Sequence, residues 1–186
     1  MIVIKLGGSL SRTDALVDCL NAVEKNYQGR SVVIVPGGGA FADQVRLAQQ
    51  LWRFDDTTAH HMALLAMRQM ALMFKGLKPD FAIADSIATI QNQLNREKTV
   101  IWSPDIIELD NAGIPASWDI TSDSLSAWLA NTLSATELIL IKSAAIEANL
   151  SLQQLAEQNI VDKAFCEFVA QAAFTVRIID AQSWGG

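Results

Sequence analysis

The sequence is poor in the residues that build metal sites and disulfide frameworks. Its 186 residues include two cysteines and two histidines, with no CxxC pair and no Cys/His cluster that would hold a structural metal. Cys19 and Cys166 lie in apolar stretches of helical character. We interpret them as small buried hydrophobes in a reducing compartment, and we expect no metal site built by the protein alone.

Positive charge and long apolar runs are also scarce. The chain has 14 lysines and arginines against 20 acidic residues, a net charge of −6, which argues against a nucleic-acid partner. No uncharged run of about 18 residues could span a membrane, and Met1 to Lys5 enter an apolar run without a basic leader segment. Because 51% of the residues are hydrophobic and 18% charged, we expect a globular, cytoplasmic protein with no membrane partner.

Short β-branched runs alternate with longer stretches of helical period. This alternation predicts an α/β fold, a three-layer αβα sandwich with an open, mostly parallel sheet. The predicted strands are Ile2–Leu6, Ser31–Val35, Phe81–Ala84, Thr99–Trp102, Leu138–Ile141 and Thr175–Ile179. The predicted helices are Asp14–Tyr27, Phe41–Phe54, Thr57–Phe74, Thr121–Leu133, Ser151–Gln158 and Asp162–Ala173. No repeat or linker divides the chain, so we expect a single domain over residues 1–186.

The first predicted strand runs into a glycine pair, in the segment Lys5-Leu6-Gly7-Gly8-Ser9. In an open α/β sheet, ligands bind at the carboxyl ends of the strands, and backbone N–H groups before a helix form an anion site. Glycines let the backbone approach a phosphate closely, and an ammonium group supplies the opposing charge. For one glycine pair alone, a tight turn beside a solvated lysine is the favoured alternative.

A second junction of this kind changes that balance. The second predicted strand leads into Gly37, Gly38 and Gly39, just before a helix. Three consecutive glycines cost conformational entropy and contribute no packing, so a mere connection explains them poorly. Neither loop has the spacing of a P-loop or of GxGxxG. Two glycine loops at adjacent strand ends suit a reaction between two anionic groups, one held by each loop.

Together these segments resemble the amino acid kinase family, which includes acetylglutamate kinase, uridylate kinase, aspartokinase and isopentenyl phosphate kinase. Two more segments add to the resemblance. Asp123 lies at the start of a predicted helix within Trp118–Ala127, and Lys142 ends the apolar strand that begins at Leu138. The four segments follow the family's order.

The resemblance implies an ATP-dependent kinase that uses Mg²⁺ and acts on a small phosphorylated molecule. It makes Lys5, Asp123 and Lys142 catalytic, with Asp123 orienting the two lysines. The nucleotide phosphates would be bound by Lys5, Gly7, Gly8, Ser9, Lys142 and Ser143. The domain would divide into an acceptor half, to about residue 115, and a shortened nucleotide half. We also expect a homo-oligomer.

The acceptor would lie at Gly37, Gly38 and Gly39. On the helix that follows, Arg46 would bind a phosphate and Asp43 an amino group, because a guanidinium pairs with phosphate and a carboxylate with ammonium. A surface ion pair between these two side chains, three residues apart, is an equally good interpretation.

Three other features leave their roles open. Asp119 precedes Asp123 by four residues and would share its helix face on a regular helix, where it would bind substrate or Mg²⁺ or simply cap. His60 and His61 lie in a Met-rich stretch that we expect to be a packed or interface helix. Trp118 is expected in the core, with a wall for a ring-containing acceptor as the alternative.

One segment departs from the family pattern. The family usually continues after this strand with Thr-Asp-Val-x-Gly-Val, which lines the adenosine pocket, whereas this chain has Ser-Ala-Ala-Ile-Glu at 143–147. The chain is also shorter than typical members, and the loss falls in the nucleotide half. The phosphate-handling half is therefore expected to follow the family more closely. Weak ATP binding, a different donor and a non-catalytic relative are the alternatives.

Within the family, the chain looks most like the small kinases of methanofuran biosynthesis. The segment 118–124, the stretch 59–67 and the short length carry this resemblance. It implies phosphorylation of [5-(aminomethyl)furan-3-yl]methyl phosphate to its diphosphate. A nucleoside monophosphate, isopentenyl phosphate or an amino acid are alternative acceptors. The isoprenoid branch usually has a histidine after the second glycine loop, where this chain has Phe41-Ala42-Asp43.

Overall fold

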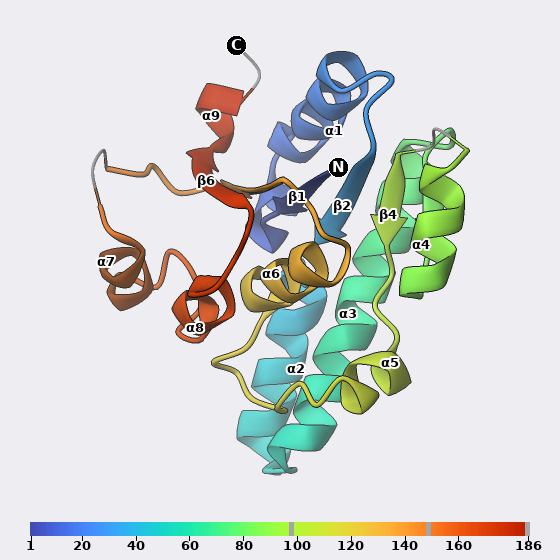
Figure 1. Ribbon diagram of the computed structural model, residues 1–186. Coiled ribbons are helices and arrows are strands. Elements are labelled where there is room, and N and C mark those ends of the chain that lie inside the picture. The colour runs from blue at the N-terminus through green and yellow to red at the C-terminus, as the bar shows by residue number, and fades with distance from the viewer. Residues whose placement is uncertain (97–98, 148–149, 185–186) are drawn as a thin grey trace.

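Six strands form one parallel sheet at the centre of the molecule (Figure 1). The computed structural model describes residues 1–96, 99–147 and 150–184. The strand order is β3-β4-β2-β1-β5-β6, and every neighbouring pair is parallel. All six predicted strands are confirmed, with these bounds: β1 (Ile2–Leu6), β2 (Val32–Pro36), β3 (Ala82–Ala84), β4 (Val100–Trp102), β5 (Glu137–Lys142) and β6 (Thr175–Asp180).

Helices occupy the connections between the strands, and α9 follows the last strand. They are the 3₁₀ helix η1 (Gly8–Arg12) and the α-helices α1 (Ala15–Asn26), α2 (Gly39–Trp52), α3 (Asp56–Leu77), α4 (Ile87–Leu94), α5 (Ile106–Asn111), α6 (Ser122–Thr132), α7 (Leu152–Glu157), α8 (Phe165–Val169) and α9 (Ala181–Trp184). The predicted helix Asp162–Ala173 is wrong in its bounds, since α8 begins only at Phe165. Asp162 is engaged elsewhere, at the start of α6.

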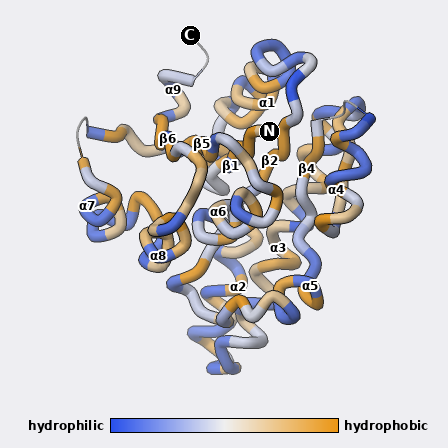
Figure 2. Tube along the Cα trace, viewed as in Figure 1, coloured by the Kyte–Doolittle hydropathy of each residue, from blue (hydrophilic) through white to orange (hydrophobic). Residues whose placement is uncertain are grey.

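The central strands are buried on both faces, which explains their continuous β-branched runs. Val3 and Leu140 belong to a core on the face that α6 and α8 cover. Ile4 and Ile139 belong to a second core, shared with α1. The three layers predicted from the sequence follow from this alternation, and Figure 2 shows the hydrophobic colour concentrated along the central strands. In the part of the chain that the structure describes, no helix is both long and apolar enough to cross a bilayer.

The parallel arrangement brings the ends of β1, β2 and β5 together. Leu6 is paired in register with Pro36 on one side and Ile141 on the other. The chain then continues the ladder by one bond on each side: Gly37 N–H donates to the Leu6 carbonyl, and Gly7 N–H donates to the Ile141 carbonyl, both at 2.9 Å. Both glycine loops therefore leave the sheet at the same edge, side by side.

Candidate active site

The two glycine loops pack directly against each other. A Cβ added at Gly8 would lie 2.3 Å from the Gly39 nitrogen, and one added at Gly37 would lie 2.4 Å from the Gly8 nitrogen. Gly39 also adopts a φ of +55°, which side chains disfavour. Loop-to-loop contact thus accounts for these glycines without any ligand. The sequence interpretation, in which they are needed for approach to a phosphate, had overlooked this packing role.

Both loops lead into helix starts that favour an anion. Within the described residues, no side chain caps the start of η1 or of α2, and neither first turn contains an acidic residue. The first N–H groups of a helix have no intrahelical acceptor, and the helix dipole adds positive potential there. The edge of the sheet at Gly8 and Gly39 therefore suits phosphate groups.

Lys5, Asp123 and Lys142 form a buried cluster beside the loops, here called the lysine–aspartate cluster. The Lys5 Nζ lies 2.8 Å from Asp123 Oδ1, and the Lys142 Nζ lies 2.7 Å from Asp123 Oδ2. The side chains are only 5%, 5% and 12% exposed for Lys5, Asp123 and Lys142. Two ammonium groups therefore face the one carboxylate of Asp123, and a phosphate could bind to both of them.

The pKa values in this cluster follow from burial and from the like charges. Burial, followed by the neighbouring ammonium of Lys5, lowers the pKa of Lys142 to about 8. Burial alone would raise the pKa of Asp123, but the two lysines more than offset it and hold that pKa below its usual value. Asp123 is therefore ionised at neutral pH, and the charge of Lys142 is sensitive to mild alkali.

Asp162 holds the start of α6, the helix that carries Asp123. Its Oδ2 accepts from Thr121 N and Thr121 Oγ1, both at 2.8 Å, and from Ser124 N at 3.0 Å. Its Oδ1 accepts from the Ser124 hydroxyl. The backbone N–H of Asp162 also donates to Asp123 Oδ2 at 3.2 Å. Thr121, the N-cap residue, forms no side-chain cap bond within the described residues, so Asp162 supplies the cap from 41 residues away.

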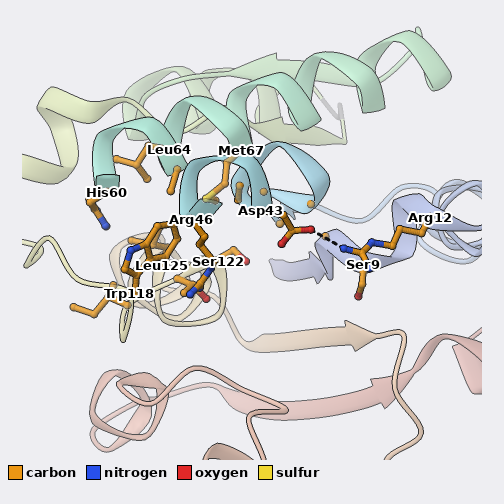
Figure 3. A pocket seen from close by; sticks show the side chains of 18 residues that line it. Ser9, Arg12, Asp43, Arg46, His60, Leu64, Met67, Trp118, Ser122 and Leu125 are labelled. Carbon is orange, nitrogen blue, oxygen red and sulfur yellow. Dashed lines mark hydrogen bonds and ion pairs between the residues drawn. The ribbon is translucent and has the colours of Figure 1, made fainter. Parts of the chain in front are cut away.

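A cavity of about 280 Å³ opens between the loops, α2, α3 and the segment before α6 (Figure 3). Ser9, Arg12 and Asp43 lie at one end of it, and His60, Leu64 and Trp118 lie at the other. The remaining predicted residues on its wall are Gly8, Gly37, Gly38, Gly39 and Arg46.

A second cavity, of about 410 Å³, adjoins the first and has Asp123 and Lys142 on its wall. Arg46, Trp118 and Thr121 line both cavities. The lysine–aspartate cluster therefore lies beside two spaces that share a wall. A site of this shape can hold two ligands next to each other.

The structure places Asp43 and Arg46 differently from the sequence interpretations. Asp43 pairs with Arg12, with 2.6 Å between Asp43 Oδ2 and Arg12 Nη2. The Arg46 guanidinium stacks 3.9 Å above the Trp118 ring, and Trp118 Nε1–H donates to Gln49 Oε1 at 2.6 Å. Both residues line the first cavity, as the acceptor interpretation expected, and the alternative, an ion pair between them, is absent from the ion pairs of the described residues.

The remaining predicted residues have mixed outcomes. Asp119 precedes α6 and does not share a helix face with Asp123; it lines the second cavity, and its exposed carboxylate lies 3.2 Å from Lys163 Nζ. The Ser143 hydroxyl lies 2.6 Å from the Ser9 hydroxyl. Arg12 and Asp162 were not predicted as site residues from the sequence, because their contacts join distant parts of the chain. Within the described residues, no three His, Cys, Asp or Glu side chains cluster as metal ligands.

Comparisons with known proteins bear on the family and the fold of this chain. Residues 1–145 match the profile described as "Amino acid kinase family". The chain is 32% identical over 143 residues to the [5-(aminomethyl)furan-3-yl]methyl phosphate kinase of Methanocaldococcus jannaschii. The aligned part covers 75% of this chain and 64% of that relative. This chain therefore spans a little under two thirds of the relative's length.

Solved structures show the same fold at low identity. The uridylate kinase of Archaeoglobus fulgidus superposes with a TM-score of 0.72 at 19% identity, covering 100% of this chain and 95% of that one. The UMP kinase of Ureaplasma parvum gives a TM-score of 0.72 at 18% identity, covering 96% and 88% of the two chains. These proteins thus share the overall fold of this chain.

Proposed function

The chain belongs to the amino acid kinase family, and from that premise we propose that it is an ATP-dependent kinase that phosphorylates a small phosphorylated acceptor. The observation that carries the proposal is the lysine–aspartate cluster. Two buried ammonium groups share one buried carboxylate at the edge of the sheet from which both glycine loops start. A site with two buried ammonium groups is suited to phosphoryl transfer, in which neutralising the phosphate oxygens is the main task.

We assign the first cavity to the acceptor and the second to the phosphates of the donor. The first lies between the two loops, and its far end is lined by Leu64, Trp118 and the buried His60, which suits a small organic molecule with a phosphate at one end. The second contains Lys142 and Asp123, with Asp119 as the exposed carboxylate that would bind Mg²⁺ together with phosphate oxygens. ATP with Mg²⁺ supplies the phosphoryl group.

The residues of this chain then have separate tasks. The Lys5 and Lys142 ammonium groups neutralise phosphate oxygens, and Asp123 fixes the position of both. The N–H groups at the starts of η1 and α2 orient the phosphates. An ionised oxygen of the acceptor's own phosphate is the nucleophile, so no general base is needed.

We propose [5-(aminomethyl)furan-3-yl]methyl phosphate as the acceptor and its diphosphate as the product. The relative of that name supports this choice by its 32% identity. Gln49 accepts from the Trp118 ring nitrogen and Arg46 stacks on one face of the ring. Trp118 lines the first cavity, where the rest of the ring would bound a small aromatic ring. This role departs from the core position expected for Trp118.

Cellular location and assembly complete the proposal. An enzyme that consumes ATP belongs where ATP is made available, so we propose a cytoplasmic location. We propose a homo-oligomer because α2 and α3 expose large apolar side chains: Leu51 is 71% exposed, Trp52 74% and Leu72 64%. Copies of the chain would cover such side chains, and light scattering on the purified protein would measure the assembly.

The acceptor is tested by measuring ADP release and identifying the product by mass spectrometry. We expect the highest kcat/KM for the aminomethylfuran phosphate among four acceptors, the other three being UMP, isopentenyl phosphate and aspartate. Faster turnover of any of these three would refute the acceptor. No acceptor-dependent ADP release from the whole panel would count against the kinase proposal itself.

A further inference from the structure

The acceptor cavity has two chemically different ends. The glycine loops, Ser9 and Arg12 form one end, while His60, Leu64 and Trp118 form the other (Figure 3). Under the proposed function, on which this inference rests, the acceptor's phosphate has to lie at the loops, where the helix starts gather. The part of the acceptor that carries no phosphate must then extend toward His60.

This orientation changes which residue can meet the acceptor's amino group. The sequence interpretation gave that role to Asp43, but Asp43 lies at the phosphate end with its carboxylate 2.6 Å from the Arg12 guanidinium. In [5-(aminomethyl)furan-3-yl]methyl phosphate, the ring separates the aminomethyl group from the phosphate. A carboxylate at the phosphate end is therefore poorly placed to bind the amine.

His60 lies at the opposite end and has an unused polar atom. The residue is only 6% exposed, and its Nε2 has no hydrogen-bond partner among the described residues. On the same wall, one and two helical turns along α3, lie the apolar side chains of Leu64 and Met67. A buried polar atom without a partner is costly, so a nitrogen in this position beside a cavity points to a ligand that completes its hydrogen bonding.

The charge state of His60 narrows the class of ligand. Burial, followed by the neighbouring His61, lowers the pKa of His60, while Asp110 and the backbone carbonyl of Ser117 act in the opposite direction. The imidazole is therefore neutral at physiological pH. A neutral imidazole has one nitrogen with a free lone pair, which accepts a hydrogen bond from an ammonium or a hydroxyl.

We propose that Nε2 of His60 accepts a hydrogen bond from the amino group at the far end of the acceptor. His60 thereby selects small phosphomonoesters that carry a hydrogen-bond donor opposite their phosphate. Trp118 lies at the His60 end and would bound the acceptor's ring there. Selectivity for the amine comes from α3, and the phosphate is bound by the loops.

The test compares His60→Phe, which keeps a flat ring but removes the nitrogen, with His60→Gln, which retains an acceptor at a similar reach. We expect His60→Phe to lower kcat/KM for the aminomethylfuran phosphate by about 10- to 100-fold, the usual range for a hydrogen bond to a charged group. For the analogue with methyl in place of aminomethyl, the same variant should change kcat/KM less than about threefold. His60→Gln should recover much of the lost discrimination.

His61→Gln is the matched control, because His61 is the next residue on α3, is 30% exposed in its side chain and pairs with Asp110 at 3.2 Å, outside the cavity wall. It should leave discrimination between the two acceptors unchanged. An equal loss for both acceptors in His60→Phe, or the same loss of discrimination in His61→Gln, would overturn the proposal.

A binding measurement separates this inference from the kinase proposal. In protein with ¹⁵N-labelled histidine and without ATP, the aminomethylfuran phosphate should shift the His60 Nε2 resonance, and the methyl analogue should not. This outcome would support His60 as the amine site even if no acceptor were turned over. Binding of both compounds with equal or absent shifts would refute it, whatever the activity.

Discussion

The first 145 residues and the segment that follows them differ in how they relate to the family. The first part matches the family profile and contains both glycine loops and all three members of the lysine–aspartate cluster. The second part lies outside that match, yet β6 pairs with β5 over six residues, and Asp162 binds the start of α6. A segment outside the family match thus supports the residue that we place at the centre of the reaction.

The largest effect is expected in the first part, at Asp123. Asp123→Asn keeps the shape but leaves two buried ammonium groups without a carboxylate, so kcat should fall by about 1,000-fold or more. Steady-state kinetics measures this, with circular dichroism to verify folding. Asp80→Asn, a change at an exposed residue, is the control. If folded Asp123→Asn kept a near-normal kcat, the role of the cluster would be wrong.

The second effect is expected outside the family match, at Asp162. Asp162→Asn weakens the cap of α6 and the support of Asp123, so kcat should fall by about 10-fold and the free energy of unfolding by about 1–2 kcal/mol. Because the charge of Asp162 raises the pKa of Lys142, the alkaline limb of the pH profile should also move to lower pH. A purely structural role would leave that limb in place.

Asp180→Asn is the matched control for this variant. Asp180 is also a capping carboxylate in the C-terminal part, since its oxygens accept from Ser183 N at 2.9 Å and Ser183 Oγ at 3.0 Å. Its loss should leave kcat and the pH profile unchanged. If Asp162→Asn changed kcat and the pH profile no more than Asp180→Asn does, the C-terminal segment would contribute to stability alone.

The pH dependence of the wild type sharpens the contrast further. The pKa of Lys142 is lowered to about 8, and the proposed role needs the ammonium form. Deprotonation above that pKa removes the charge, so kcat/KM should decrease by about tenfold per pH unit above it. Lys142→Arg keeps its charge far into alkali and should abolish this limb, although its rate will be lower. If the alkaline decrease of kcat/KM were unchanged in Lys142→Arg, that decrease would have to come from another titrating group.

The smallest effect concerns the glycine loops in the first part. Gly8→Ala forces a Cβ against the Gly39 backbone, so the free energy of unfolding should fall by about 1–3 kcal/mol even without ligand. Gly76→Ala is the control, since a Cβ there meets no described heavy atom within 4 Å and should stabilise α3 by about 0.5–1 kcal/mol. Thermal unfolding measures both. If Gly8→Ala were as stable as the wild type, loop-to-loop packing would not explain these glycines, and ligand binding would remain as their role.

The sequence predicted the sheet well because buried parallel strands have an unmistakable pattern of β-branched residues. It missed α4 and α5, which are short, although Ser86 and Asp105 cap their first turns. It brought Lys5, Asp123 and Lys142 together only through the family resemblance, since their spacing alone carries no such information. The roles of Asp162 and His60 could not be predicted from the sequence. A helix cap supplied from 41 residues away and a buried nitrogen without a partner among the described residues are visible only in three dimensions.

We propose that the lysine–aspartate cluster promotes transfer of a phosphoryl group from ATP to the phosphate of a small amine-bearing acceptor. Phosphorus NMR of a reaction with ATP and the aminomethylfuran phosphate tests it directly. We expect the acceptor's single resonance to be replaced by the two coupled resonances of a diphosphate as ADP accumulates, with Asp123→Asn showing neither change. ADP formation without the coupled pair, or product formation by Asp123→Asn at the wild-type rate, would contradict the account.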